Sequence, residues 1–246
     1  MAEESALESE VNNKESKGLI AKAIEMSFNV SVAVGTTAFG MMTAGVAAPI
    51  VASAFAGGGL LGRIFSKKET PFFKLFGDTL KTYSAVNTVY HPMSMLANAT
   101  MPLAAKAGAG LIGYGGPFIA KSLYSVTAYN WTFITAFKGV HHLYDNAFNP
   151  KGIVKSVKTD FWPLANRFSW IFAPGYILAA NGVSNLNIFG YKAPTFAVNA
   201  APAAIYNGIN PPKSYSNQHG VSASHPNINP NYSSRQNAVT PNPATA

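Results

Sequence analysis

Residues 26–62 read MSFNVSVAVGTTAFGMMTAGVAAPIVASAFAGGGLLG, a run of 37 residues without Asp, Glu, Lys or Arg. A helix of a water-soluble protein normally carries charged residues on its outer face, whereas a lipid-facing helix needs about 20 apolar residues and no such face. We therefore predict that this stretch is embedded in a membrane. Pro49 lies inside it, and it either kinks one long helix or marks the turn of a hairpin whose halves would be short for full crossings.

Small side chains recur at every fourth position of this stretch. Such residues let two helix backbones approach closely, which is how helices associate when lipid removes the hydrophobic drive between them. The sequence therefore predicts tight helix packing and a homo-oligomer held through small-residue helix faces. This small-residue row consists of Gly40, Ala44, Ala48, Ala52 and Ala56, followed by Gly58 and Gly62.

The composition of the whole chain agrees with a membrane protein. Of its 246 residues only 11% are charged, while 48% are hydrophobic; a typical soluble domain carries about 25% charged residues. The absence of cysteine excludes disulfides, Cys-ligated zinc and thiol catalysis. The net charge of +8 comes from 18 basic residues spread between apolar segments. That spread favours loops at a lipid bilayer and predicts no nucleic-acid partner.

Two more uncharged stretches follow, and a basic cluster stands before and after them. Residues 82–105 carry no formal charge and residues 107–137 contain only Lys121, which predicts two crossings joined near Lys106 and the glycine-rich residues 107–116. Basic loops remain on the cytoplasmic side, so an even number of crossings would place both clusters on one side. The clusters are Arg63, Lys67, Lys68, Lys74 and Lys81, and then Lys138, Lys151, Lys155, Lys158 and Arg167.

The two ends of the chain differ from the predicted membrane domain of residues 26–210. Residues 1–25 hold six Glu, so we expect an acidic head with an amphipathic helix along the interface. Residues 168–191 form another uncharged run, which is predicted to be bent or broken near Pro174 and Gly175. After Lys192 the prolines and asparagines make a regular helix doubtful, and the segment is interpreted as surface-lying or re-entrant. Residues 211–246, rich in Pro, Asn and Ser, are predicted to be disordered.

No motif in the sequence indicates catalysis. No Ser-His-Asp arrangement, paired carboxylates or dinucleotide fingerprint can be identified by spacing, so we predict a non-enzymatic protein without catalytic residues or cofactors. His141 and Asp145 would share a helical face beside His142, but a metal site needs a third or fourth ligand, and no metal is predicted. Lys106 and Lys121 are candidates for a polar pathway, because an ionisable residue inside lipid is usually functional. The alternative is that both lie at the ends of crossings.

Residues 162–174, WPLANRFSWIFAP, contain a further motif. They resemble the signature W-P-x-x-Q-x-x-N-F-x-x-x-P of the Mpv17/PMP22 family of small organellar membrane proteins. Trp162, Pro163 and Pro174 match the signature, Asn166 and Trp170 are conservative replacements, and Ser169 departs from it. The resemblance implies a helical bundle with a small-channel or membrane-homeostasis role, in which the three matching residues would set helix packing.

Together these patterns predict an all-α, polytopic membrane helix bundle with about four crossings. The predicted function is that of a small-solute channel or pore-like helix assembly. The alternative is a structural membrane or virion scaffold protein without transport activity.

Overall fold

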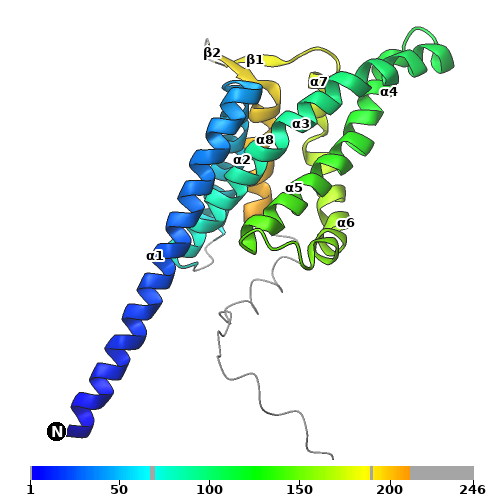
Figure 1. Ribbon diagram of the computed structural model, residues 1–246. Helices are drawn as coiled ribbons and strands as arrows, with labels where there is room; N and C mark the ends of the chain where they lie inside the picture. Colours follow the sequence, from blue (N-terminus) through cyan, green and yellow to red (C-terminus); the bar gives the residue numbers. More distant parts are fainter. Residues whose placement is uncertain (1, 67–69, 189–190, 211–246) are drawn as a thin grey trace, which may run out of the picture.

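The computed structural model describes residues 2–66, 70–188 and 191–210, and the chain is mostly helical, as predicted. The predicted disordered tail, residues 211–246, lies outside the described residues. Figure 1 shows the helices packed side by side, with the N-terminal part of the first helix projecting from one end. In chain order the elements are α1 (Ala2–Ala44), α2 (Ala47–Phe65), α3 (Phe72–Ile112), α4 (Gly116–Tyr124), the π-helix η1 (Ser125–Tyr129), α5 (Asn130–Asp145), α6 (Ile153–Ile171), α7 (Ala173–Ala180), β1 (Asn185–Ile188), β2 (Tyr191–Pro194) and α8 (Thr195–Ile209).

The uncharged stretch of residues 26–62 forms a hairpin of two helices. The turn lies at Gly45, whose φ of +65° suits a residue without a Cβ atom. Pro49 lies in the first turn of α2, where its missing N–H removes no intrahelical hydrogen bond. Residues Gly18–Ala44 and Ala47–Phe65, 27 and 19 residues long, are the two helical segments of the described chain that are long and apolar enough to cross a membrane.

The later helices extend and close this hairpin. α3 runs beside α1 in the same direction, because Asn29 and Gly40 of α1 lie next to Gly77 and Asn87 of α3. The turn after Ile112 lies within the predicted junction, which comprised Lys106 and the glycine-rich residues 107–116. There α3 and α4 touch backbone to backbone at Gly108 and Gly116. α4, η1 and α5 then follow one another without a break.

The C-terminal third confirms one prediction and corrects two others. The break predicted near Pro174 is present, because α6 ends at Ile171 and α7 runs only from Ala173 to Ala180. An antiparallel pair of short strands, β1 and β2, follows, so the fold is not purely helical. The doubt about a regular helix after Lys192 is also wrong. α8 continues through Pro202 and packs its alanines and Gly208 against the glycines of α2.

Aromatic side chains fill the core between α2 and the C-terminal helices. Phe55 of α2 stacks on Phe172 with ring centroids 5.2 Å apart. Phe133 and Phe137 of α5 and Phe196 of α8 surround the same ring. Buried phenyl groups of this kind contribute much of the energy of a helical core. Phe168 of α6 also lies against Phe55, which therefore ties the hairpin to α5, α6 and α8.

The outer surface of α1 is apolar although it is exposed. Leu19, Ile24, Val34 and Met42 are all more than 60% exposed. The apolar residues of α3 and α4 near their turn, such as Leu111 and Phe118, are exposed as well. A contiguous exposed apolar surface marks a lipid or protein contact rather than a water-facing side.

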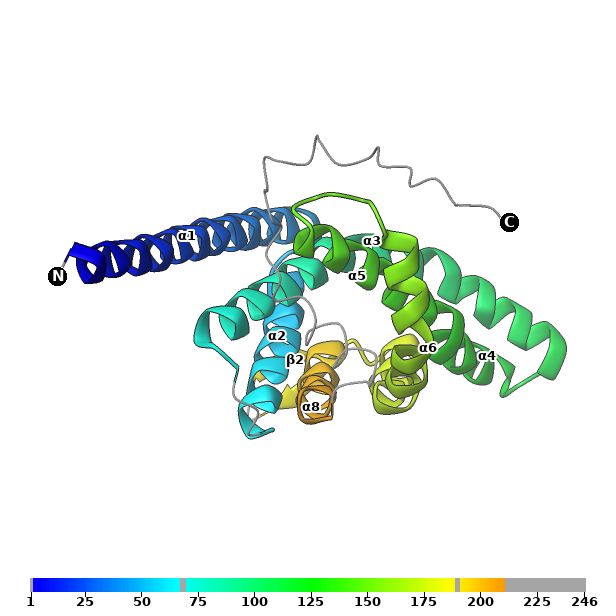
Figure 2. The same ribbon diagram turned by 90° about the horizontal axis from the view of Figure 1, so that it is seen from below.

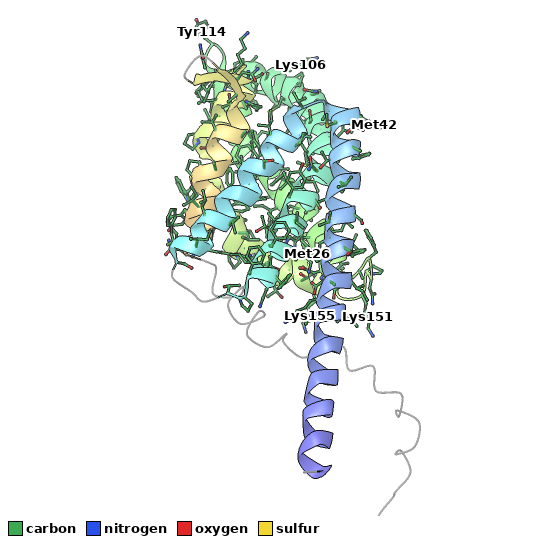
Figure 3. The ribbon with its side chains drawn as sticks, turned by 90° about the vertical axis from the view of Figure 1, so that its left-hand side faces the viewer. Met26, Met42, Lys106, Tyr114, Lys151 and Lys155 are labelled. Carbon is green, nitrogen blue, oxygen red and sulfur yellow. The ribbon has the colours of Figure 1, made fainter. Side chains whose placement is uncertain are left out.

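The two ends of the helical body differ in charge. Lys151 and Lys155 lie at the same end as Met26, whereas Met42, Lys106 and Tyr114 lie at the other (Figure 3). Lys81 joins this first end through an ion pair with Asp145, so parts of both predicted basic clusters meet there. We call it the basic end and the other one the opposite end.

Candidate functional site: buried charges and a polar seam

Six ionisable residues from four helices meet near the basic end, and we call them the ionic cluster. At its centre, the Lys81 ammonium of α3 lies 3.5 Å from a carboxylate oxygen of Asp145 and 3.2 Å from one of Glu25. On α5, Nδ1 of His141 lies 2.9 Å from the other Asp145 oxygen, one helical turn away. The members are Glu25 of α1, Lys81 of α3, Lys138, His141 and Asp145 of α5, and Asp160 of α6.

The Lys138–Asp160 pair is the most deeply buried part of this cluster. Its ammonium and carboxylate atoms are 2.6 Å apart, and the side chains are 7% and 2% exposed. Removing two charges from water costs several kcal/mol for each ion, which their attraction repays only at close range. Within the described part of the chain, the second carboxylate oxygen of Asp160 has no hydrogen-bond partner. The pair therefore marks a specific and costly arrangement between α5 and α6.

The cluster also changes the proton affinity of two of its members. Lys81 and Asp145 lie just outside the uncharged stretches. Burial alone would raise the pKa of Asp145, but the neighbouring His141, Lys81 and Lys138 outweigh it and hold the pKa well below its usual range. Burial alone would lower the pKa of Lys81, yet Asp145 and Glu25 raise it overall. The cluster thus holds Lys81 protonated and Asp145 ionised.

Buried polar side chains continue from the ionic cluster along the interface of α1 and α3, and we call them the polar seam. It comprises Asn29 of α1 and Ser84 and Asn87 of α3, each at most 3% exposed. The Asn29 Nδ2 atom, the Ser84 hydroxyl and both polar atoms of the Asn87 side chain have no hydrogen-bond partner among the residues that the structure describes. A buried polar atom without a partner costs about 1–3 kcal/mol, so a group of them is unusual.

Glycines allow the two helices to enclose the seam. A Cβ atom at Gly40 would lie 2.9 Å from Oδ1 of Asn87, and one at Gly77 would lie 3.3 Å from Nδ2 of Asn29. Larger residues at either position would press on the amide groups. The missing side chains therefore leave the room that the asparagines occupy.

Two hydrogen bonds between hydroxyl groups flank the seam. The hydroxyls of Thr37 and Tyr83 are 2.8 Å apart and join α1 to α3. Those of Thr88 and Tyr144 are 2.6 Å apart and join α3 to α5. Both threonine hydroxyls also donate to a carbonyl oxygen of their own helix, that of Ala33 for Thr37 and that of Ser84 for Thr88. These two interhelical bonds fix α3 against both neighbours of the seam.

The small-residue row divides between two interfaces inside the chain. Gly40 lies against Ala48 and Asn87, while Ala44 lies at the end of α1. Further along α2, a Cβ atom at Gly58 would lie 2.6 Å from the Ala201 carbonyl oxygen of α8. A Cβ atom at Gly62 would meet the Ile205 carbonyl oxygen and Gly208. The buried members Ala48, Ala52 and Ala56 complete this side of α2. A homo-oligomer stays a prediction, and its contacts would lie on other surfaces.

The remaining predicted residues lie apart from the ionic cluster. Lys106 is exposed at the opposite end, and Lys121 is partly exposed on α4. Trp162 is 60% exposed on α6, Pro163 lies within that helix, and Pro174 lies in the first turn of α7. The structure thus does not bring the two lysines to the polar seam.

His141 and Asp145 share a helical face, as expected, and they bond to each other. His142 turns its Nε2 atom to the carbonyl oxygen of Lys151 instead. In the part of the chain that the structure describes, no three His, Asp or Glu side chains come together in a way that could hold a metal ion.

Sequence reasoning did not identify the Lys138–Asp160 pair or the seam. The pair joins residues on different helices, and no local pattern relates them. The seam has a weak local signal, because Ser84, Asn87 and His91 follow one another at spacings of three and four in an otherwise apolar stretch. This spacing places them on one face of a helix.

Comparison with known proteins found no matching protein family, no matching curated protein and no matching solved structure.

Proposed function

We propose that the protein is a multi-pass membrane protein that acts as a small-solute channel, with the polar seam as part of its pathway. Its exterior and interior support this proposal. Large apolar residues of α1, such as Val34 and Met42, are exposed, whereas the Lys138–Asp160 pair and the asparagines of the polar seam are buried inside the bundle. This distribution suits a protein surrounded by lipid, because polar groups then find partners only inside the bundle.

Four crossings are proposed: α1, α2, α3 and the continuous rod of α4, η1 and α5. A crossing needs about 20 residues at about 1.5 Å per residue, and each of these rods provides nearly that length or more. Two crossings would lie between the basic clusters, so both clusters would face the same side, as the positive-inside rule requires.

The unpartnered polar atoms of the seam carry the proposal. Buried amide and hydroxyl groups are almost always hydrogen-bonded, and ordered water usually supplies the missing partners. Asn29, Ser84 and Asn87 leave four such atoms on one interface. We infer that water or a small polar solute bonds to them in turn as it moves between α1 and α3.

The ionic cluster would form the entrance on the basic side. Glu25 and Lys81 reach across from α1 to α3 just before the seam begins at Asn29. A solute would therefore pass fixed charges of both signs before it reaches neutral amides. Lys106 and Lys121, which lie toward the opposite end, would be close to the exit.

A structural scaffold in the membrane is the second candidate, and the α2–α8 contact favours it. Gly58, Gly62 and Gly208 bring these two helix backbones together so closely that no Cβ atom fits between them. Such packing, together with the buried Lys138–Asp160 pair, suits a rigid body. A rigid bundle could shape a membrane without conducting any solute.

Two measurements test these proposals. Alkaline carbonate washing should leave the protein in the membrane pellet, and release into the supernatant would exclude every crossing. Purified protein in liposomes should then speed the osmotic shrinkage and recovery caused by a small polar solute such as glycerol. Membrane retention without flux at any pH or voltage would favour the scaffold.

A further inference from the structure

Each acidic side chain that the structure describes has an internal partner. Asp78 pairs with Arg63 at 2.7 Å, and Glu25, Asp145 and Asp160 belong to the ionic cluster. These are the only four acids whose side chains the structure describes. None of these four acids pairs with Lys155 or Lys158, so these two exposed lysines leave positive charge on the surface of α6.

The exposed lysines of α6 lie in the first half of this helix. Lys155, Lys158 and Trp162 follow one another at spacings of three and four, which places them on one face of the helix. All three are exposed, and Asn166 and Trp170 extend the same side. We call this surface the lysine face. The opposite side of α6 carries the buried Asp160, Leu164 and Phe168, so packing fixes the direction in which the lysines point.

The position of the lysine face is equally specific. Lys151 and Lys155 lie at the basic end (Figure 3). α6 lies on the side of the bundle away from α1 in both views (Figures 1 and 2). Trp162 packs edge-on against Trp131 of α5, with ring centroids 6.0 Å apart. An indole held in this way beside lysines is typical of the level of lipid headgroups.

We propose that the lysine face of α6 binds anionic phospholipid headgroups. The lysines would pair with headgroup phosphates, while Trp162 would lie at the boundary between headgroups and acyl chains. Exposed tryptophans and the apolar surface of α1 favour a bilayer over nucleic acid, whose backbone offers no apolar layer. This inference rests on the proposed membrane location but not on solute conduction.

The test uses the full-length protein in detergent micelles that contain equal amounts of phosphatidylglycerol and phosphatidylcholine. Native mass spectrometry counts the molecules of each lipid that the protein retains. The wild type should retain more phosphatidylglycerol. The double variant Lys155→Gln/Lys158→Gln should lose this preference, by about fivefold for each lysine at low ionic strength.

Matched variants separate the lysine face from general charge. Lys106→Gln/Lys192→Gln removes two lysines outside the lysine face and should leave the preference unchanged. Lys155→Arg/Lys158→Arg should retain it, which distinguishes lost charge from a damaged fold. Equal retention of the two lipids by the wild type, an equal loss in the Lys106/Lys192 variant, or displacement of the lipid by a duplex oligonucleotide at lower concentration would overturn the proposal.

A failure of the lipid-binding proposal can be distinguished from a failure of the proposed channel function. Loss of flux with an intact lipid preference would remove the channel and leave the lysine face. Release by carbonate with an intact preference would indicate a peripheral protein that uses the same face. An intact flux without any lipid preference would remove only the lysine face.

Discussion

The ammonium of Lys138 lies 2.6 Å from the carboxylate of Asp160, and this ion pair between α5 and α6 is almost completely buried. It is the most deeply buried pair of the ionic cluster. Its energetic consequence is asymmetric, because breaking such a pair costs more than replacing both partners.

Asp160→Leu should therefore lower the free energy of unfolding by about 3–5 kcal/mol, because Lys138 keeps its charge without its nearest carboxylate. The double variant Lys138→Met/Asp160→Leu should recover most of this loss. Unfolding by a denaturing detergent, followed by circular dichroism, measures both values. Lys155→Gln, an exposed lysine, is the control and should change little. A double variant as unstable as the single one would contradict the prediction.

The close approach of α2 and α8 gives a second prediction. Gly62→Ala places a methyl group against the Ile205 carbonyl and Gly208, and overpacking of this kind should cost about 1–3 kcal/mol. Gly59→Ala is the matched control, since nothing lies within 4 Å of its Cβ position. It should stabilise α2 by about 0.5–1 kcal/mol, because alanine restricts the unfolded chain. Equal effects of the two substitutions, measured by the same unfolding assay, would be inconsistent with the contact.

Substitutions in the polar seam should change flux more than folding. Ser84→Val and Asn87→Leu replace buried polar groups by apolar ones and remove the hydrogen bonds that a passing solute would use. Each should reduce glycerol flux in liposomes toward the rate of protein-free vesicles while the helical spectrum stays the same. Asn98→Leu changes an exposed asparagine of the same helix and should conduct like the wild type. Unchanged flux in both seam variants would exclude the seam as the pathway.

Acid should destabilise the protein through Asp145. Its pKa is below the usual range in the folded protein, whereas an unfolded Asp has a pKa of about 3.9. Below about pH 4 the unfolded chain therefore takes up a proton that the folded chain does not, which favours unfolding. This contribution is present above about pH 5 and is lost as the pH falls further.

Asp145→Asn is the corresponding variant. It should be less stable than the wild type at neutral pH and should lose less stability between about pH 5 and pH 3, since no proton is taken up at this position. Unfolding curves across this range measure the difference between the two slopes. Identical slopes would show that Asp145 does not contribute to the acid sensitivity.

Several elements of the fold follow from local sequence and could be predicted. The uncharged stretch of residues 26–62 is helical, and its small residues allow close packing. The glycine-rich region before Pro117 forms the turn between two long helices. The two strands at residues 185–194 were missed, because four-residue strands give too short an alternation to recognise. α8 was missed because Pro202 argues against a helix locally, and packing against α2 overrides that preference.

By itself, the sequence determined that the chain is helical and apolar, since the distribution of charge along a chain decides which segments can leave water. Only the tertiary structure decided that Lys138 meets Asp160 and that Asn87 lies against Gly40. Both pairs join residues on different helices, so their contact depends on how whole helices pack. The packing of helices is the sum of many weak contacts, which no local pattern contains.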